Sequence, residues 1–318
     1  MGQATGYFTH KDCWRHEMGG GHPECPARLD AIEDRLLISG LDVALERREA
    51  SQASITDLEL AHSRMHIAAL RGLSDSLRDD IAAGGPTHSQ LDPDTSINIH
   101  SWDAILRAAG AAIDATDAVM AGEIANAFCA VRPPGHHATR AGAMGFCFVN
   151  NVAVAAKYAL ERHGLKRVAI VDFDVHHGNG TEDIVAGDER ILMCSFFQHP
   201  FYPEGGSRSN ASNLVNLPVP AYTKGMDIRE LIDMMWIPRL EAHKPQLVFI
   251  SAGFDAHRED DMGQLGLVEQ DYAWITQRIK DVALRHAKGR IVSCLEGGYS
   301  LSALARSVEA HLRVLADV

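Results

Sequence analysis

The sequence lacks any long hydrophobic run. No stretch of its 318 residues reaches the roughly 18 uninterrupted apolar residues that a membrane-spanning helix needs. Its first residues, MGQATGYFTHKDCWRHE, also lack the basic segment followed by an apolar one that is typical of a signal peptide. We therefore expect a cytoplasmic protein that does not bind membranes.

Closely spaced cysteine pairs and clusters of basic residues are also missing. The six cysteines form no CxxC motif, and several lie in apolar runs such as AFCAV and ILMCSFF, which indicates buried free thiols in a reducing compartment. The formal net charge of −12, without a Lys/Arg-rich run, argues against direct binding of nucleic acids. An acidic surface could attract polyamines or lysine side chains, although such surfaces most often serve solubility.

Hydrophobic residues make up 46% of the chain, which is enough for a buried core. Unbroken apolar runs of strand length recur in the second half, at ANAFCAV near residue 126 and at 167–173, 190–196, 246–254 and 290–298. Such runs are typical of strands that are covered on both faces. Segments with helical periodicity separate them, at 150–164, 227–243, 270–287 and 301–316. This pattern predicts a three-layer α/β/α fold with a mainly parallel central sheet.

The first half is predicted to be more helical, with helices over 26–40, 60–84 and 101–122. Between them, GGPTHSQLDPDTS (84–96) is rich in turn residues and has no periodicity, so we predict a surface loop there. We find no polar linker and no internal repeat. Residues 1–318 are therefore predicted to form a single domain.

Four of the predicted strands run into residues that can bind a metal or transfer a proton. The sequences that follow them are RPPGHH (132–137), DFDVHHGNG (172–180), GFD (253–255) and EGGY (296–299). In open parallel sheets, functional groups gather beyond the carboxyl ends of the strands. We therefore predict one site at that edge of the sheet.

The segment DFDVHHGNG carries Asp172, Asp174 and His176 at alternate positions, which share one face of an extended chain. Buried carboxylates this close would raise each other's pKa unless a cation neutralised them. With Asp255 from another strand end, Asp174 and His176 form a three-ligand set that leaves a coordination position open, as in catalytic zinc sites. Taken singly, an Asp after a strand usually caps a helix and a lone His is usually a core residue, but their joint arrangement favours a metal.

Two further features indicate proton transfer and oxyanion binding. His136 and His137 follow Pro-Pro-Gly, a stiff turn that holds both rings in fixed directions. Tyr299 follows the flexible Gly297-Gly298 and could donate its hydroxyl to a developing oxyanion. A tyrosine after two glycines is equally often a packing residue, so both interpretations of Tyr299 stay open.

Six segments together are similar to the motifs of the histone deacetylase and acetylpolyamine amidohydrolase family. They are HPECPARL, RPPGHHA, GFCFVNN, DFDVHHGNGT, AGFDAH and LEGGY, and they span residues 22 to 299 in the family's order. HPECPAR looks like the class II branch. The resemblance implies the arginase/deacetylase fold and removal of acetyl or other acyl groups from lysine side chains or small acylated amines, with acetylpolyamine hydrolysis as the alternative.

The resemblance also implies two cations. One catalytic Zn²⁺, with Fe²⁺ as the alternative, would be bound by Asp174, His176 and Asp255. A structural K⁺ would lie nearby, held partly by main-chain oxygens of Asp172, Asp174, His176, Ser195 and Phe196.

By the same resemblance, His137 would be the general base for water and then the proton donor to the amine. His136, hydrogen-bonded to Asp172, would act electrostatically, and Tyr299 would polarise the carbonyl. Asn179 stands beside the second histidine where one branch of the family has Asp. Because a neutral partner favours imidazolium less, His137 should be the more easily neutral histidine.

The substrate tunnel is expected to include Gly145 and Phe146 from the GFCF motif, together with Tyr202 and Met262. Polyamine-specific class II members have a Glu at the position that we align with Met262. A flexible thioether there suits an aliphatic stem, so acetyl-lysine-type substrates are predicted over acetylspermidine. The carboxylates at 259–261 could still supply a charge at the rim.

Two rival classes are a binuclear manganese ureohydrolase and an inactive, metal-stabilised interaction protein. A ureohydrolase needs further Asp and His ligands for its second metal, and an inactive relative is expected to have lost a ligand, a dyad histidine or Tyr299. Both are therefore disfavoured. The sequence leaves a monomer and a homo-oligomer open.

Overall fold

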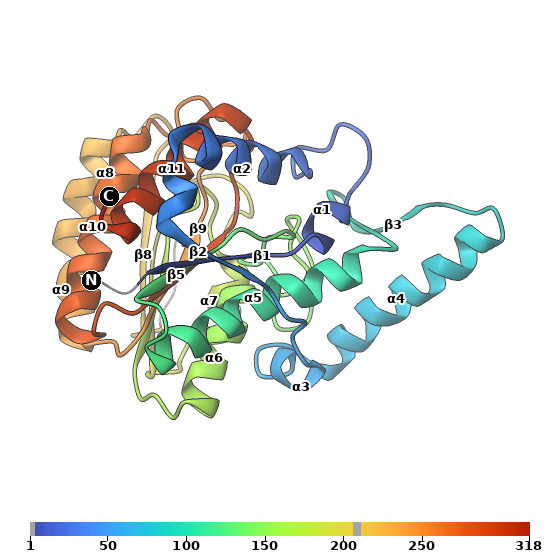
Figure 1. Cartoon of the computed structure of the whole chain (residues 1–318), viewed down its shortest axis with the longest axis horizontal. Coiled ribbons are helices and arrows are strands. Elements are labelled where there is room, and N and C mark those ends of the chain that lie inside the picture. Colours follow the sequence, from blue (N-terminus) through green and yellow to red (C-terminus); the bar gives the residue numbers. More distant parts are fainter. Residues whose placement is uncertain (1–3, 206–210) are drawn as a thin grey trace.

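The computed structural model describes residues 4–205 and 211–318, and these residues are built around one large parallel sheet (Figure 1). Its eight strands lie in the order β2-β1-β5-β10-β9-β6-β7-β8, and every neighbouring pair is parallel. The strands are β1 (Thr5–Thr9), β2 (Leu45–Glu49), β5 (Asn126–Cys129), β6 (Val168–Asp172), β7 (Ile191–Gln198), β8 (Leu214–Val219), β9 (Val248–Ala252) and β10 (Ile291–Leu295).

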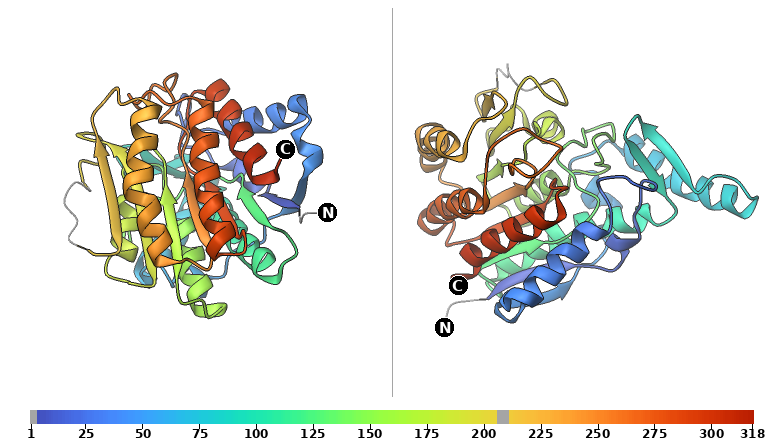
Figure 2. Two further views of the ribbon diagram at one scale, coloured as in Figure 1. Left: turned by 90° about the vertical axis from the view of Figure 1, so that its left-hand side faces the viewer. Right: turned by 90° about the horizontal axis from the view of Figure 1, so that it is seen from above.

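Helices cover both faces of this sheet. Figure 2 shows α8, α10 and α11 side by side on one face, and α11 also packs against α2; α5 and α6 pack on each other and cover the opposite face. The longer helices are α2 (Ala27–Ser39), α4 (Arg64–Ala82), α5 (Ser101–Ala121), α6 (Asn151–Arg162), α10 (Glu269–His286) and α11 (Leu301–Ala316). The shorter ones are α1 (Asp12–Arg15), η1 (Leu41–Ala44), α3 (Ile55–Leu58), α7 (Asn179–Val185), α8 (Gly225–Leu231), the π-helical turn η2 (Ile232–Trp236) and α9 (Ile237–His243).

The predicted three-layer fold with a mainly parallel sheet is confirmed. All residues of β5, β6, β9 and β10 are buried, as expected for strands that helices cover on both faces. The predicted helices are present, and the segment 227–243 is helical with a π-helical turn in its middle. Among the helices of the described residues, none is both long and apolar enough to cross a bilayer.

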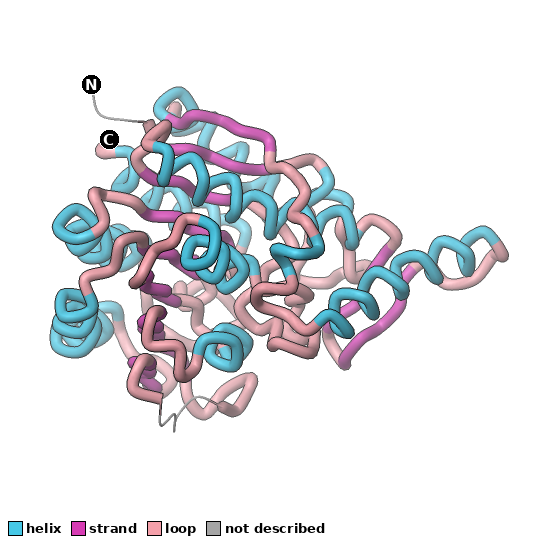
Figure 3. Tube along the Cα trace, turned by 90° about the horizontal axis from the view of Figure 1, so that it is seen from below, coloured by secondary structure: helices cyan, strands magenta, loops and turns pink. Residues whose placement is uncertain are grey.

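The prediction of a loop over 84–96 was wrong. Residues His88–Asp92 (β3) and Thr95–Asn98 (β4) form an antiparallel hairpin, which extends beside α4 as an arm away from the main body (Figure 3). At its turn, the backbone N–H of Asp94 donates to the Asp92 carboxylate. Both strands are mostly polar; β3 is half-buried, whereas Thr95, Ile97 and Asn98 of β4 are buried. Backbone pairing therefore forms them without the alternation that marks a strand in a sequence.

Three strands of the main sheet were not predicted. β2 and β8 are its edge strands, and their sequences LERRE and LVNLPV include charged residues or proline, which protect a sheet edge and mask the apolar pattern. β1 is a short buried strand between β2 and β5. The sheet is therefore wider than the five strands that the hydrophobic runs indicated.

Candidate active site

The four strands that precede the polar motifs are direct neighbours at the centre of the sheet, in the order β5-β10-β9-β6. All four run in the same direction, so the residues after them meet at one edge. The motifs 132–137, 296–299, 253–255 and 172–180 are thereby brought together from segments far apart in the chain.

Asp174, His176 and Asp255 form the one group of three metal-ligating side chains found among the described residues. One ligand atom from each lies within 4.8 Å of the others, and all three residues are buried. Nδ1 of His176 lies 3.1 Å from Oδ1 of Asp174 and 3.2 Å from Oδ2 of Asp255. Two carboxylates and one imidazole are a donor set that fits a divalent cation such as zinc.

The electrostatics of the three groups also fit a cation. Burial alone would lower the pKa of His176, but the carboxylates of Asp174 and Asp255 raise it to about 10. Burial and the charge of Asp174 raise the pKa of Asp255 to about 7. Oδ2 of Asp255 is buried, and no donor among the described residues forms a hydrogen bond with it. Its contact with Nδ1 of His176, at 3.2 Å, does not have hydrogen-bond geometry. A bound cation would satisfy this oxygen and keep all three groups in their metal-binding protonation states.

Two positions near the three ligands, 253 and 297, require glycine. A Cβ on Gly253 would lie 2.0 Å from Oδ2 of Asp174, and one on Gly297 would lie 2.0 Å from Oδ2 of Asp255. The N–H of Gly297 also donates to Oδ2 of Asp174 at 2.9 Å. The glycines of the GFD and EGGY motifs therefore allow the backbone to approach the ligands closely.

His136 and His137 lie side by side beside these ligands, with their ring centroids 4.1 Å apart. Nδ1 of His136 is 3.0 Å from Oδ2 of Asp172, and Nδ1 of His137 is 2.7 Å from Oδ1 of Asn179. Burial alone would lower the pKa of His136, but Asp174 and Asp172 hold it well above its usual value. Burial, and then the charge of His136, hold the pKa of His137 well below its usual value.

These hydrogen-bond partners favour different protonation states of the two rings. The amide oxygen of Asn179 only accepts, so Nδ1 of His137 carries the hydrogen and Nε2 keeps the lone pair of a neutral imidazole. The amide group of Asn179 donates in turn to the sulfur of Met144, which fixes its orientation. His136 is positively charged between carboxylates. The arrangement supplies one base and one cation at adjacent positions.

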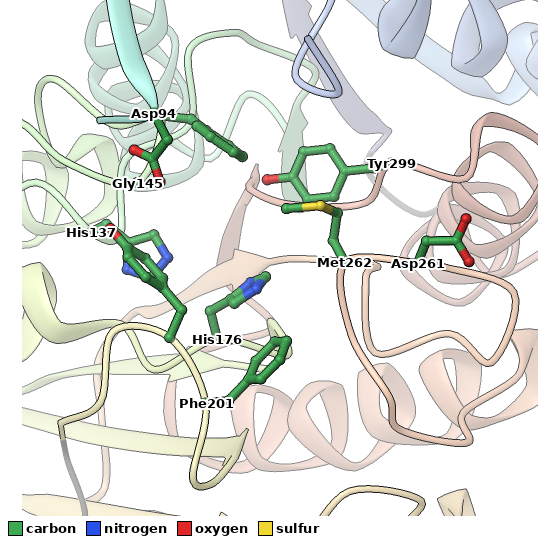
Figure 4. A pocket seen from close by; sticks show the side chains of 10 residues that line it. Asp94, His137, Gly145, His176, Phe201, Asp261, Met262 and Tyr299 are labelled. Carbon is green, nitrogen blue, oxygen red and sulfur yellow. The ribbon is translucent and has the colours of Figure 1, made fainter. Parts of the chain in front are cut away.

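A pocket of about 260 Å³ opens over these groups. Figure 4 shows His137 and His176 on one side and the hydroxyl of Tyr299 pointing into it from the other. The rings of Tyr299 and Phe146 pack nearly perpendicular to each other, with centroids 5.8 Å apart. The pocket is lined by Asp94, His137, Gly145, Phe146, His176, Phe201, Tyr202, Asp261, Met262 and Tyr299.

The wall formed by the GFCF motif has an unusual backbone. Gly145 and Phe146 both have positive φ angles, of 55° and 68°. A Cβ on Gly145 would lie 2.5 Å from the ring of His137, so only glycine fits there. The N–H of Phe146 donates to the hydroxyl of Thr95 at 2.9 Å, which ties this wall to the hairpin. A strained backbone held by its surroundings is typical of functional sites.

The structure brings together nearly all residues singled out in the sequence. The four expected tunnel residues, Gly145, Phe146, Tyr202 and Met262, all line the pocket, and Tyr299 and His137 line it with them. Ser195 and Phe196 do not line the pocket. They lie on β7, where Ser195 pairs in register with Asp172 on the neighbouring strand.

Sequence reasoning missed two lining residues, Asp94 and Phe201. Asp261, one of the three carboxylates considered for the rim, does line the pocket. Phe201 stacks on the ring of His176, with centroids 5.4 Å apart and an interplanar angle of 15°. Its position next to Tyr202 was the available signal. Asp94 reaches the pocket from the hairpin turn, and nothing in its sequence neighbourhood indicated this.

Glu296 has a role that its place in the LEGGY motif did not reveal. Its buried carboxylate accepts the backbone N–H groups of Gly135 and His136, at 2.6 and 3.1 Å, and the hydroxyl of Ser251 at 3.1 Å. It thereby joins the turn that carries the histidines to the end of β10.

Comparisons with known proteins agree with this geometry. A model of the histone deacetylase domain family matches residues 22–315. A histone deacetylase-like amidohydrolase of Pseudomonas aeruginosa is 38% identical over 324 aligned positions, which cover 94% of this chain and 83% of that protein. A probable deacetylase of Archaeoglobus fulgidus is 36% identical over 305 positions, covering 93% and 82%.

Two further relatives extend this likeness. The type-2 histone deacetylase 2 of Dictyostelium discoideum is 43% identical over 246 positions, which are 70% of this chain but 14% of that much longer protein. The crystal structure of the HDA15 HD domain is similar with a TM-score of 0.90 and 33% identity, covering 99% of this chain and 90% of that one.

The fold, and the pocket at the carboxyl ends of the sheet strands, define a hydrolase of the arginase and deacetylase type. The domain match and the relatives narrow this class further. The chain belongs to the histone deacetylase family, and its activity is that of a deacetylase or amidohydrolase.

Proposed function

We propose that this protein is a zinc-dependent amidohydrolase that removes acetyl or other acyl groups from lysine side chains or small acylated amines. The observation that carries the proposal is the convergence of three features: the buried ligands Asp174, His176 and Asp255, of which His176 lines the pocket; the neutral imidazole of His137; and the hydroxyl of Tyr299.

Asp174, His176 and Asp255 would hold one Zn²⁺, the usual metal of the family, with Fe²⁺ as the alternative. When bound, such an ion polarises a carbonyl and acidifies a water molecule. Asp172, Asp174, His176, Ser195 and Phe196 would hold a structural K⁺. The register pair of Asp172 with Ser195, beside the ligand-bearing loop, supports this second cation site.

The chain's own residues then move the protons. His137 is held neutral, so its Nε2 can accept the proton of the attacking water and later deliver it to the departing amine. His136, charged and bonded to Asp172, stabilises negative charge that develops nearby. Tyr299 keeps its hydroxyl proton, because burial raises its pKa well above the usual value, and can donate it to the oxyanion.

The walls of the pocket favour an acyl-lysine stem. Phe146, Tyr202 and Met262 form an aromatic and thioether lining, which suits an aliphatic chain. Of the three neighbouring carboxylates, Glu259 is bonded to Arg306 at 2.8 Å, Asp260 is buried, and Asp261 lines the pocket. We therefore propose acetyl-lysine-type substrates over acetylspermidine, with Asp261 as the residue that could favour the polyamine.

A panel of substrates tests this choice. We expect kcat/KM to be higher for acetyl-lysine peptides than for N8-acetylspermidine, and longer acyl-lysines measured in parallel show how deep the pocket is. A clearly higher kcat/KM for N8-acetylspermidine would contradict the proposal. If Asp261→Asn then removed that preference while Glu259→Gln kept it, the protein would be an acetylpolyamine amidohydrolase.

A further inference from the structure

Asp260 differs from its acidic neighbours because it is buried, with 4% of its surface exposed, and none of the ion pairs in the described part of the chain includes it. Its carboxylate instead accepts three backbone N–H groups. Oδ2 accepts those of Tyr299 and Ser300, at 2.6 and 2.8 Å, and Oδ1 accepts that of Met262 at 3.0 Å. One side chain thus joins two segments of the pocket wall.

The first segment is the start of α11. Ser300 is the N-terminal cap of this 16-residue helix, and its own side chain makes no capping bond. The N–H groups at the start of a helix lack partners within the helix and carry partial positive charge. A carboxylate that accepts them forms charge-assisted hydrogen bonds, which are stronger than neutral ones. Asp260 therefore supplies the anchor that the helix sequence does not.

This anchor fixes the backbone of Tyr299 on the side of α11. On the other side the chain runs through Gly297 and Gly298, and Gly298 has a φ of 120° that other residues rarely adopt. Glycines give a backbone much intrinsic conformational freedom, which is limited in part by the bonds from the Gly297 N–H to Asp174 and from Nε of Arg28 to the Gly298 carbonyl. The bond from the Tyr299 N–H to Asp260 limits that freedom at the residue whose hydroxyl points into the pocket (Figure 4).

The second segment is the part of the pocket wall that contains Met262. The turn that contains Asp260 is closed by a bond from its own N–H to the carbonyl of His257, at 2.9 Å. Oδ1 of Asp260 then holds the N–H of Met262, whose side chain lines the pocket next to Tyr299. The carboxylate of Asp260 therefore helps to fix the distance between Tyr299, the proposed oxyanion donor, and Met262, which lines the pocket.

We propose that Asp260 is a positioning residue: by binding the backbone at the start of α11, it holds the hydroxyl of Tyr299 in its place in the pocket. It touches neither substrate nor metal ligands, and it acts through Tyr299. The inference rests on the proposed role of Tyr299 as oxyanion donor.

A double-mutant cycle tests the proposal. Asp260→Asn removes the charge and places an amide N–H₂ against backbone N–H groups, so we expect kcat for an acetyl-lysine peptide to fall about ten- to a hundredfold. In a Tyr299→Phe background the same change should lower kcat less than about twofold, because the hydroxyl that Asp260 positions is already gone. Equal falls in both backgrounds would overturn the proposal. Glu259→Gln is the matched control, because it changes an exposed carboxylate of the same segment that binds Arg306 and not the backbone of Tyr299.

Hydrogen exchange gives a readout that does not depend on activity. Asp260→Asn should speed amide exchange in the peptide that contains Tyr299 and Ser300, while Glu259→Gln leaves it unchanged. If Asp260→Asn does not fold, Asp260→Ser, a smaller polar replacement, takes its place with the same expectation. Unchanged exchange would overturn the positioning role, whereas faster exchange in a protein without deacylase activity would contradict the proposed function and leave the anchor standing.

Discussion

At the scale of single residues, the difference between His136 and His137 comes from burial and from the charges around each ring. Burial alone would lower the pKa of His136, but Asp174 and Asp172 raise it, whereas burial and the charge of His136 lower the pKa of His137. Asp172 presents a carboxylate oxygen to His136, and Asn179 presents an amide oxygen to His137. A carboxylate stabilises imidazolium, whereas an amide does so much less. Two neighbouring residues of the same type thereby become a cation and a neutral base.

Tyr299→Phe should keep the fold and the bound metal but lower kcat by about two to three orders of magnitude, which is the usual effect of removing one oxyanion donor. The motivation is the hydroxyl that points into the pocket from a backbone anchored by Asp260 (Figure 4). Steady-state kinetics on an acetyl-lysine peptide, with elemental analysis for the metal, is the measurement.

Tyr202→Phe is the matched control, because it removes a hydroxyl from the same pocket. This variant should change kcat by less than about tenfold. Near-normal kcat in Tyr299→Phe would show that Tyr299 is a packing residue, the interpretation that the sequence left open.

At the scale of secondary structure, the strands most visible in the sequence are those that build the site. β5, β6, β9 and β10 are buried on both faces, so their apolar runs are unbroken, and the ligand-bearing loops follow them directly. The edge strands and the hairpin were missed because polar residues, proline or backbone pairing hide their pattern. Asp94 was missed with the hairpin, since its place in the pocket depends on how that arm folds back.

A buried ionic network connects three of these elements. Glu24 accepts from Nη1 of Arg28 on α2, at 3.0 Å, and from Nη2 of Arg132 after β5, at 2.7 Å. Nε of Arg28 donates to the carbonyl of Gly298 after β10, at 2.7 Å. Burial alone would raise the pKa of Glu24, but the two guanidinium groups lower it to about 2.

Glu24→Gln should lower the free energy of unfolding at pH 7 by about 3–5 kcal/mol, because it leaves two buried guanidinium groups without their carboxylate. The pKa of Glu24 is lower in the folded state than its ordinary value of 4.5. The stabilisation is therefore complete above about pH 4.5 and is lost as the pH falls towards 2. Urea unfolding across this range should show that loss in the natural protein, and Glu24→Gln should lack it.

The control for this network is Glu46→Gln, which removes an exposed ion pair with Arg48. We expect it to cost less than about 1 kcal/mol, as surface pairs usually do. If Glu24→Gln were no more destabilising than Glu46→Gln, the buried network would not be a major source of stability.

At the scale of the whole molecule, the site is assembled from segments that lie between residues 94 and 299 of the chain. The metal ligands and the histidines could be predicted because each follows a recognisable strand. Phe201 and the positioning role of Asp260 could not, and the choice of Asp261 among the carboxylates at 259–261 stayed open, since loop conformation decides which of several neighbouring side chains faces the pocket. That residues 1–318 form a single domain remains our prediction.

The central claim, one catalytic zinc ion held by Asp174, His176 and Asp255, is tested most directly by metal removal and titration. The chelated protein, checked by elemental analysis, should lose its activity on an acetyl-lysine peptide and regain it in proportion to added Zn²⁺ up to one equivalent per chain. Asp255→Ala should bind less zinc and regain almost no activity. Full activity of the metal-free protein, or recovery that needs two equivalents of Mn²⁺, would contradict the account.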